Sequence, residues 1–370
     1  MPLYYFFYAG FPGNVPQAEI RSLLRQHNYQ YISRCTAGRV EILEITPPLD
    51  FGVLDLCAFK NLAGEVLAVN ETSSLNSQAL DTMLAQVDWK TFTIGRTGRT
   101  WAVRVKGNRD YFDPRELKSS ELSLAEKINT LWPYPVQLRQ AEIHFQLIVD
   151  KTLSGLTILC FGVQRYKQSP AVKQRLSRTL ALRRPYFSIG TMNNPISHVV
   201  ANLSETPPGH ILLDPFCGSG GILIESALNG NYCLGIDVDR IVIRGAHKNL
   251  RYFAPNMRLG EVRASALALP LRSYPENLGN NILGVSTDLP YGRSTSTQGL
   301  GVVTIWEGFL RELHRTIVPG SKCCLVVPNT EEVHVFMTKV RQDARFNVID
   351  TCTQVVHDSL TRLFVVLQLL

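Results

Sequence analysis

Residues 212–221 read Leu212-Leu213-Asp214-Pro215-Phe216-Cys217-Gly218-Ser219-Gly220-Gly221, and they decide the fold of the second half of the chain. The turn at their centre lies between a stretch predicted as a strand, 210–213, and one predicted as a helix, 221–228. A glycine-rich turn here lets backbone N–H groups approach a ligand closely, and the helix N-terminus that follows favours a negative group. The spacing is that of neither a GxxxxGK phosphate loop nor a GxGxxG loop.

Strands and helices alternate regularly around this turn. The predicted strands span 210–213, 232–238, 259–264, 282–287, 322–327, 346–355 and 363–369. The predicted helices span 221–228, a segment ending near 252, 302–318 and 331–342. Such alternation favours a parallel, doubly wound α/β sheet. The last two strands are too close in sequence for a parallel crossover, so they are predicted to form an antiparallel hairpin.

Strands and helices follow a less regular order in the first half of the chain. Its predicted strands span 3–9, 40–45, 65–69, 102–106, 142–149 and 157–163, and its predicted helices span 17–27, 76–87 and 114–131. Because these do not alternate strictly, one or two small α+β units are expected. Arg183-Arg184-Pro185 predicts a linker, which divides the chain into domains 1–182 and 183–370.

The turn at 214–221 has the pattern of the first motif of class I S-adenosylmethionine methyltransferases, Asp-Pro-Phe-x-Gly-Ser/Thr-Gly-Gly. This resemblance implies that Asp214, Phe216, Gly218 and Gly220 bind S-adenosylmethionine. About twenty residues on, Asp237 ends a predicted strand, where an acidic side chain is suited to bind ribose hydroxyls. Asp239 is predicted either to share this role or to cap the next helix.

A second motif closes the strand at 282–287 and reads Thr287-Asp288-Leu289-Pro290-Tyr291-Gly292-Arg293-Ser294. It resembles the Asp/Asn-Pro-Pro-aromatic motif of methyltransferases that act on exocyclic amines. The lone pair of an aryl amine is delocalised into its ring, so a carboxylate and a backbone carbonyl that accept its two N–H bonds make it more nucleophilic. We therefore predict Asp288, Pro290 and Tyr291 as catalytic residues, with Tyr291 stacked on the base.

The charge of the chain is concentrated in one window. Residues 151–200 carry eight basic residues and no acidic residue, whereas the whole chain has a net charge of +7. A local basic excess without acidic partners is typical of nucleic-acid binding, and it predicts RNA contacts by Lys173, Arg175, Arg178, Arg183 and Arg184. A solvated basic helix followed by a linker is the alternative.

Composition excludes several classes of protein. With 45% hydrophobic and 19% charged residues, the chain is not mostly disordered. It has no apolar run long enough for a membrane span, and its uncharged, aromatic N-terminus does not resemble a secretory signal. None of its eight cysteines forms a CxxC pair, so no zinc or other metal site is predicted. A reduced, cytoplasmic protein is expected.

At the level of family, the chain resembles the archaeal tRNA (guanine-N2-)-methyltransferases that act on guanosine 10, which carry a THUMP domain before a class I methyltransferase domain. The resemblance rests on the two motifs, on Arg183-Arg184-Pro185-Tyr186-Phe187, and on His357-Asp358-Ser359-Leu360-Thr361-Arg362. It covers residues from about 140 to 370 in motif order, and the first 140 in general layout only. It implies that Arg293 contacts RNA, and it leaves open mono- or dimethylation and the need for a small activator subunit.

Three positions depart from the family pattern. Leu289 stands where the family usually has Pro, which is predicted to add a free N–H group. Ser265 stands where an acidic residue commonly binds the adenine amino group, so we expect Ser265 to bind the cofactor more weakly. His198 stands where relatives carry Arg.

The sequence therefore predicts transfer of a methyl group from S-adenosylmethionine to N2 of a guanosine in tRNA. The base must leave its stack, and residues 1–182, including a THUMP-like domain, are expected to grip the folded RNA. Two alternatives stay open: an N6-adenine methyltransferase on DNA or RNA, and an RNA-binding protein with a decayed active site.

Overall fold

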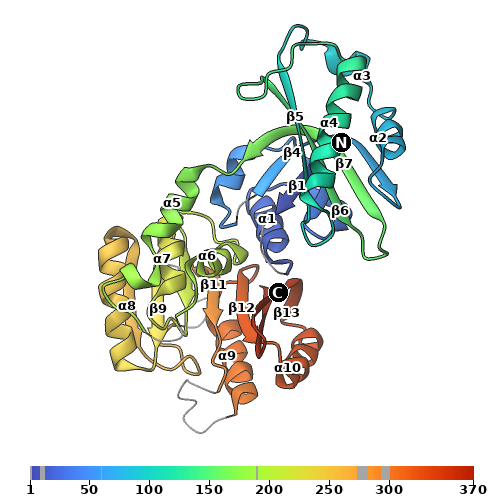
Figure 1. The fold of residues 1–370 in the computed structure, drawn as a ribbon. Coiled ribbons are helices and arrows are strands. Elements are labelled where there is room, and N and C mark those ends of the chain that lie inside the picture. The colour runs from blue at the N-terminus through green and yellow to red at the C-terminus, as the bar shows by residue number, and fades with distance from the viewer. Residues whose placement is uncertain (1, 9–12, 60, 189–190, 273–281, 293–300) are drawn as a thin grey trace. The chain divides into compact units, whose positions relative to one another are not determined.

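The computed structural model describes residues 2–8, 13–59, 61–188, 191–272, 282–292 and 301–370 (Figure 1). The chain divides into two compact units. Unit 1 comprises Met1–Gly10, Tyr29–Asp55 and Phe59–Gln168, and unit 2 comprises Phe11–Asn28, Leu56–Ala58 and Ser169–Leu370. Among the described residues, no helix combines the length and the apolar character needed to cross a membrane.

Unit 1 is built on one seven-stranded sheet in the order β2-β3-β1-β4-β7-β6-β5. Its strands are β1 (Leu3–Tyr8), β2 (Gln30–Ala37), β3 (Val40–Thr46), β4 (Asn61–Thr72), β5 (Trp101–Gly107), β6 (Ile143–Lys151) and β7 (Thr157–Lys167). Neighbours are antiparallel except the parallel pair β5 and β6. The mixed helix and strand content agrees with the predicted α+β character, but the sequence analysis missed β2.

The described residues of unit 1 form the α-helices α2 (Ser77–Leu84), α3 (Trp89–Thr93) and α4 (Pro114–Leu131). The bounds predicted for α4 are confirmed, and Asp113 caps it by accepting a hydrogen bond from the Arg115 N–H. Aromatic side chains dominate the core of this unit, where Phe145 packs against Trp101 and Phe161. Unit 1 therefore has a hydrophobic core of its own.

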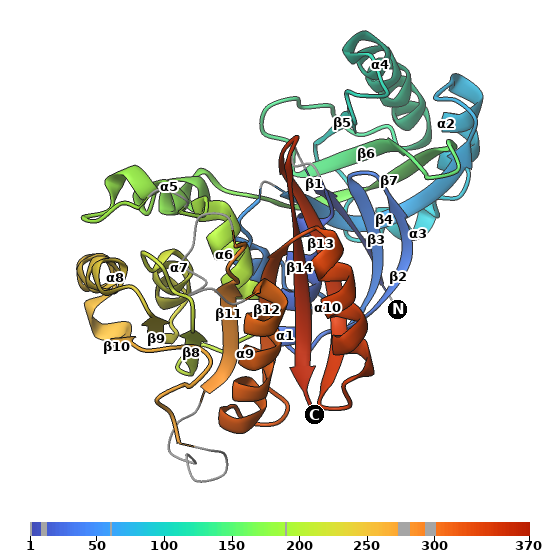
Figure 2. The same cartoon turned by 90° about the horizontal axis from the view of Figure 1, so that it is seen from below.

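Unit 2 is an open α/β sheet in the order β10-β9-β8-β11-β12-β14-β13 (Figure 2). Its strands are β8 (Ile211–Asp214), β9 (Tyr232–Asp237), β10 (Arg258–Arg263), β11 (Ile282–Asp288), β12 (Lys322–Pro328), β13 (Phe346–His357) and β14 (Leu360–Leu369). The strands from β10 to β12 are parallel, and β14 runs antiparallel to both β12 and β13. The predicted parallel sheet and terminal hairpin are confirmed.

Helices cover both faces of this sheet. The described α-helices of unit 2 are α1 (Val15–Gln26), α5 (Pro170–Arg178), α6 (Asn194–Leu203), α7 (Gly221–Leu228), α8 (Arg240–Phe253), α9 (Val302–Thr316) and α10 (Glu331–Gln342). Short 3-10 turns occur at η1 (Phe51–Leu56), η2 (Ala181–Arg183) and η3 (Pro255–Met257). Side chains alternate along β11: Val285 packs into the core with Trp306 of α9 and Phe336 of α10, whereas Ser286 donates a hydrogen bond to the Val200 carbonyl of α6. Hence α9 and α10 cover one face and α6 covers the other.

The N-terminal helix α1 belongs to unit 2, where it packs on α6 and β13. Buried Glu19 accepts hydrogen bonds of 2.9 Å from Asn202 of α6 and from the Ala58 N–H. Asn14 accepts a bond of 2.9 Å from the Thr353 N–H on β13. These contacts join α1 to residue 58, to α6 and to β13, although these segments lie far apart in sequence.

The compact units differ from the predicted domains 1–182 and 183–370. The long segment of unit 2 begins at Ser169 and not at residue 183. The unit also contains residues 11–28 and 56–58. The reason is physical: α1 buries its apolar side in unit 2, where it contacts α6 and β13, and no local sequence pattern shows which sheet a helix will cover. The predicted linker at 183–185 begins with the last residue of η2, and α5 lies shortly before η2.

Candidate active site

Three carboxylates gather at the carboxyl edge of the parallel sheet in unit 2. Asp214 ends β8, Asp237 ends β9 and Asp288 ends β11. Because β9, β8 and β11 are consecutive neighbours, these three ends meet at one edge, where open α/β sheets bind their ligands. The two sequence motifs, about seventy residues apart, are thus brought together as predicted.

The glycine-rich turn after β8 takes up left-handed backbone conformations. Gly218 has φ of +52° and Gly220 has φ of +81°, and Gly220 is the N-cap of α7. A Cβ atom at Gly218 would meet no other atom within 4 Å, so open space adjoins this part of the loop. Both positions require the freedom of glycine at positive φ.

Asp237 is linked to this loop by a backbone contact. Its Oδ2 accepts a hydrogen bond of 3.0 Å from the Gly218 N–H, and its Oδ1 accepts one of 2.9 Å from the Asp239 N–H. Burial raises the pKa of Asp237, and these two bonds oppose the rise. Asp239 itself caps α8 by accepting bonds from the Ile241 and Val242 N–H groups, so its predicted capping role is confirmed.

Asp214 lies beneath the loop with almost no exposed surface. Its Oδ1 accepts hydrogen bonds from the Thr287 hydroxyl at 2.7 Å and from the Phe216 N–H at 3.2 Å. Burial raises the pKa of Asp214 to about 8, although these bonds oppose the rise. The carboxyl group therefore joins the turn after β8 to the end of β11.

Ser265, which follows β10, is predicted to bind the cofactor. In the structure its hydroxyl oxygen accepts a hydrogen bond of 3.2 Å from the Leu267 N–H.

The segment after β11 arranges the second motif. Tyr291 donates a hydrogen bond of 2.6 Å to Asp288 Oδ1, and Arg362 Nε donates one of 3.2 Å to the Tyr291 hydroxyl. Burial raises the pKa of Asp288 to about 6, and the nearby Arg362 charge and the Tyr291 bond oppose that rise. The pKa of Tyr291 is raised well above its usual range by burial and by Asp288.

Two further contacts fix the backbone of this motif. The Leu289 N–H, predicted as an additional free group, donates to the Val326 carbonyl at 2.9 Å and prolongs the pairing of β11 with β12. That prediction is wrong because the neighbouring strand supplies an acceptor. The Trp306 indole donates to the Pro290 carbonyl at 3.2 Å. Arg293, predicted to bind RNA, lies outside the described residues.

The residues predicted for RNA binding lie in different environments. Arg178 and Arg183 are exposed, Arg175 is half-buried, and the side chain of Lys173 is outside the described part of the structure. Arg184 is only 6% exposed. Its Nε donates to the Thr179 carbonyl at 3.1 Å, and its guanidinium lies against Gly221, where a Cβ atom would stand 3.1 Å from Nη1. The prediction for Arg184 is therefore wrong, because this side chain packs inside unit 2.

His198, which the sequence analysis marks as a departure from the family pattern, belongs to a buried polar network. The two ring nitrogens of His198 lie 3.2 Å from Glu225 Oε2 and 2.7 Å from the Leu56 carbonyl. Glu225, on α7, also accepts a bond of 2.5 Å from Thr179. The network ties residue 56 to the helix that begins at the glycine-rich turn.

Sequence reasoning missed two features of this unit. Arg362 is 71 residues from Tyr291 in sequence, and only its place in the terminal hairpin resemblance pointed to it. The exposed face of α8 carries Arg240, Arg244, Lys248 and Arg251. Their spacing of three or four residues on a helix was the available signal.

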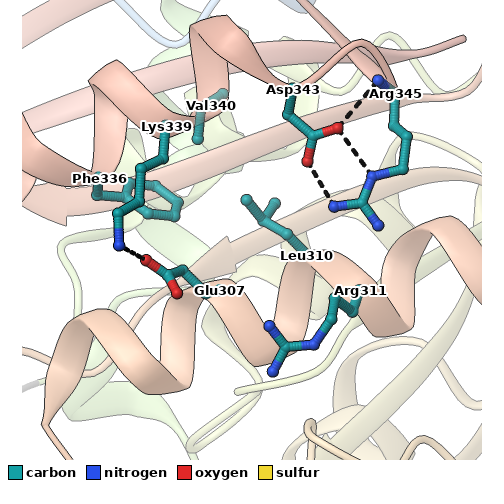
Figure 3. Close-up of a pocket in the computed structure, with 8 residues that line it drawn as sticks. All are labelled: Glu307, Leu310, Arg311, Phe336, Lys339, Val340, Asp343 and Arg345. Carbon is teal, nitrogen blue, oxygen red and sulfur yellow. Dashed lines mark hydrogen bonds and ion pairs between the residues drawn. The ribbon is translucent and has the colours of Figure 1, made fainter.

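A small hollow of about 170 Å³ lies between α9 and α10, away from these carboxylates (Figure 3). Two ion pairs flank it, Lys339 with Glu307 and Arg345 with Asp343, and its floor is apolar. Asp343 and Arg345 follow the C-terminal end of α10, which lies at the amino edge of the sheet. This hollow therefore has no part in the arrangement at the carboxyl edge.

An open parallel sheet with a glycine-rich turn after β8, an acidic end to β9 and an Asp-Leu-Pro-Tyr turn after β11 defines a class I, S-adenosylmethionine-dependent methyltransferase. Residues 182–356 match the family model of the RMKL-like methyltransferase domain. The chain belongs to the tRNA (guanine(10)-N2)-dimethyltransferase family.

Three relatives show the range of that similarity. The tRNA (guanine(10)-N2)-dimethyltransferase of Methanothermobacter thermautotrophicus is 24% identical over 360 residues, 96% of each chain. The probable enzyme of the same name from Methanothermococcus thermolithotrophicus is 36% identical over 120 residues, 30% of this chain and 74% of that protein. The U6 snRNA (guanine-N(2))-methyltransferase THUMPD2 of Bos taurus is 27% identical over 154 residues, 41% of this chain and 28% of that protein.

Proposed function

We propose that this enzyme methylates the exocyclic N2 of a guanosine in tRNA, at position 10, once or twice. The observation that supports the proposal is the position of Asp288 at the same sheet edge as Asp237. In this interpretation Asp288 accepts hydrogen bonds from the substrate amine, and Asp237 binds the cofactor. Relatives named for this reaction support the same substrate.

The residues at the edge fit S-adenosylmethionine. Asp237 ends β9 beside a glycine turn with open space at Gly218, which suits a carboxylate that binds ribose hydroxyls while backbone groups approach the ligand. Phe216, Gly218, Gly220 and Ser265 would line the same site, and Asp214 would support it through the Phe216 N–H. The bound cofactor supplies an electrophilic methyl group. Asp237→Ala is expected to weaken cofactor binding in calorimetry, and equal affinity would exclude Asp237 from the ribose site.

Asp288 would orient the guanine. The edge of guanine offers N1–H and N2–H as adjacent donors, and an ionised carboxylate is acceptor-only, so it can accept both. Asp288 Oδ2 has no hydrogen-bond partner within the described residues, which leaves it for the substrate. The second N2 proton needs a carbonyl. Leu289 offers one without a partner in the described chain, whereas the Pro290 carbonyl already accepts the Trp306 indole.

Adenine fits this site less well. Its N6–H donor adjoins an acceptor, N1, and an acceptor-only carboxylate cannot pair with N1. Tyr291, whose hydroxyl is held by Asp288 and Arg362, would present its ring to the flipped base. We keep the N6-adenine reaction and the decayed enzyme as outcomes of the test below.

The exposed basic side chains of α8, together with Arg178 and Arg183, would contact the RNA backbone and are called the basic surface of unit 2. The Tyr186 N–H and carbonyl bind the Asn249 amide at 2.8 and 2.9 Å, which joins the segment after Arg183 to α8. Residues 240–260 contain five basic residues and no acidic one. The four on the exposed face of α8 form no ion pair within the described residues. Such unpaired charge suits phosphates.

Unit 1 would also bind the tRNA, as a THUMP-like domain. This rests on the general layout of the first 140 residues and on the family resemblance, which implies such a domain. All eight cysteines are free thiols, most of them buried, which supports a reduced, cytoplasmic setting. Whether a small activator subunit takes part is tested by assaying the purified chain alone.

The decisive experiment incubates the purified chain with unmodified tRNA transcripts and labelled S-adenosylmethionine, followed by nucleoside mass analysis. We expect N2-methylated guanosine from position 10. A transcript with inosine at that position lacks the 2-amino group and should accept no methyl group. N6-methyladenosine would assign the enzyme to the adenine class, and binding of cofactor and RNA without any product would indicate a decayed site.

A further inference from the structure

The terminal hairpin reaches the methyl-transfer site through one side chain. Arg362 lies on β14, opposite Pro328 at the carboxyl end of β12. The Asn329 N–H donates to the Thr361 carbonyl at 2.7 Å, which fixes β14 at this point. From there, Arg362 Nε reaches the Tyr291 hydroxyl at 3.2 Å, and that hydroxyl is 2.6 Å from Asp288 Oδ1.

The chain of hydrogen bonds has only one possible direction. Arg Nε can donate but cannot accept, so the Tyr291 oxygen is the acceptor of the first bond. The single hydroxyl proton of Tyr291 is then directed to Asp288, which must accept it on Oδ1. An ionised Asp288 satisfies this arrangement and keeps Oδ2 free of protein contacts within the described residues.

Within the part of the chain that the structure describes, Arg362 is the cation that acts on Asp288. Asp214 at the end of β8 and Cys324 on β12 also lie close enough for electrostatic interaction with Asp288. Asp214 is acidic and Cys324 is a buried thiol, so neither favours a negative charge on Asp288. Arg362 and the Tyr291 bond oppose the effect of burial on the pKa of Asp288, which is about 6.

We propose that Arg362 is a positioning residue of this active site: through Tyr291 it keeps the Asp288 carboxylate ionised and holds Oδ1, so that Oδ2 meets the substrate amine. This inference rests on the proposed function. It goes beyond that function by assigning the terminal hairpin a part in the chemistry, with no direct contact between Arg362 and the substrate.

The activity test is a pH profile of kcat/KM on tRNA for four proteins. Arg362→Gln removes the positive charge that lowers the pKa of Asp288. Loss of a nearby opposite charge raises the pKa of a carboxyl group by about one unit or more. Relative to wild type at the same pH, the rate of Arg362→Gln should therefore be about fivefold lower at pH 6 and nearly unchanged at pH 8.5. Arg362→Lys keeps the charge and should retain the wild-type acid limb. The matched control Arg341→Gln removes an exposed Arg of α10 and should behave as wild type.

An acid limb that does not move in Arg362→Gln would overturn the inference, as would a shift in Arg362→Lys as large as that in the Gln variant. If Arg362→Gln does not fold, Tyr291→Phe breaks the same chain at Asp288 and keeps the ring. It should move the limb in the same direction, and an unmoved limb would again overturn the inference.

A second readout does not depend on activity. In protein labelled with ¹³C at the carboxyl carbons of Asp, the signal missing from Asp288→Asn identifies Asp288. Its titration should move to higher pH in Arg362→Gln and stay in place in Arg341→Gln. If the wild type does not methylate tRNA, the proposed function fails and this titration still tests Arg362. If the wild type is active and the titration does not move, the inference alone fails.

Discussion

The Tyr291 hydroxyl donates a hydrogen bond of 2.6 Å to Asp288 Oδ1, across the turn that follows β11. The sequence motif predicts Tyr291 as a stacking residue, and the structure adds a second property, a direct hold on the carboxylate. One residue can serve both purposes, because the hydroxyl and the face of the ring point in different directions.

Asp288→Ala is expected to abolish methylation and to leave RNA affinity nearly unchanged. The substitution removes the acceptor for the guanine donors and leaves the basic surface of unit 2 intact. Turnover measured with labelled cofactor, together with filter binding of tRNA, checks this. Turnover above a few per cent of wild type would contradict the role of Asp288.

Asp214→Asn is expected to change how stability depends on pH. The pKa of Asp214 is raised to about 8 in the folded protein, so between about pH 4 and pH 8 the folded chain keeps a proton that the unfolded chain has lost. This group therefore favours folding most at low pH, and its contribution declines by at most about 1.4 kcal/mol per pH unit as pH rises through that window.

Asn accepts both bonds at Oδ1 and cannot ionise, so the variant should lack this decline. Denaturant unfolding of wild type and variant from pH 5 to pH 8 measures the difference. Parallel curves would show that Asp214 does not titrate in this window. The variant should also keep cofactor affinity, because the Phe216 N–H retains its acceptor.

Glu19→Ala is expected to destabilise unit 2 by about 1–3 kcal/mol, because it leaves the buried Ala58 N–H and one bond of Asn202 without an acceptor. Thermal unfolding of the full chain measures this. Glu116→Ala, at an exposed position of α4 in unit 1, is the matched control and should have little effect. An equal response of both variants would argue against α1 as part of unit 2.

A chain cut to residues 183–370 lacks α1 and should therefore also be less stable than unit 2 within the full chain.

Removal of charge from α8 is expected to reduce the salt dependence of tRNA binding. With about four to six phosphate contacts, the log–log slope of affinity against salt should be about −3 to −5. Arg244→Ala with Lys248→Ala should make it shallower by about 1.4–1.8. Arg311→Ala with Arg341→Ala removes the same charge from α9 and α10 and should leave the slope unchanged. Equal slopes for the two double variants would show that α8 is only a solvated face.

The sequence by itself determined the parallel sheet of unit 2, its cofactor class and the three carboxylates at the carboxyl edge of that sheet. These features follow from local patterns: apolar runs set the strands, glycines permit a turn at positive φ, and consecutive parallel strands bring their ends to one edge. The terminal hairpin was equally readable, because a short connection permits only an antiparallel pair.

Tertiary structure alone decided the contacts between distant segments. Glu19 meets Asn202 across 183 residues of sequence, and Arg362 meets Tyr291 across 71. The basic composition of its segment predicts Arg184 on the surface. In the structure its side chain is buried and packs against Gly221. Hydrogen bonds and burial depend on which elements become neighbours in space, and neither charge nor periodicity along the chain carries that information.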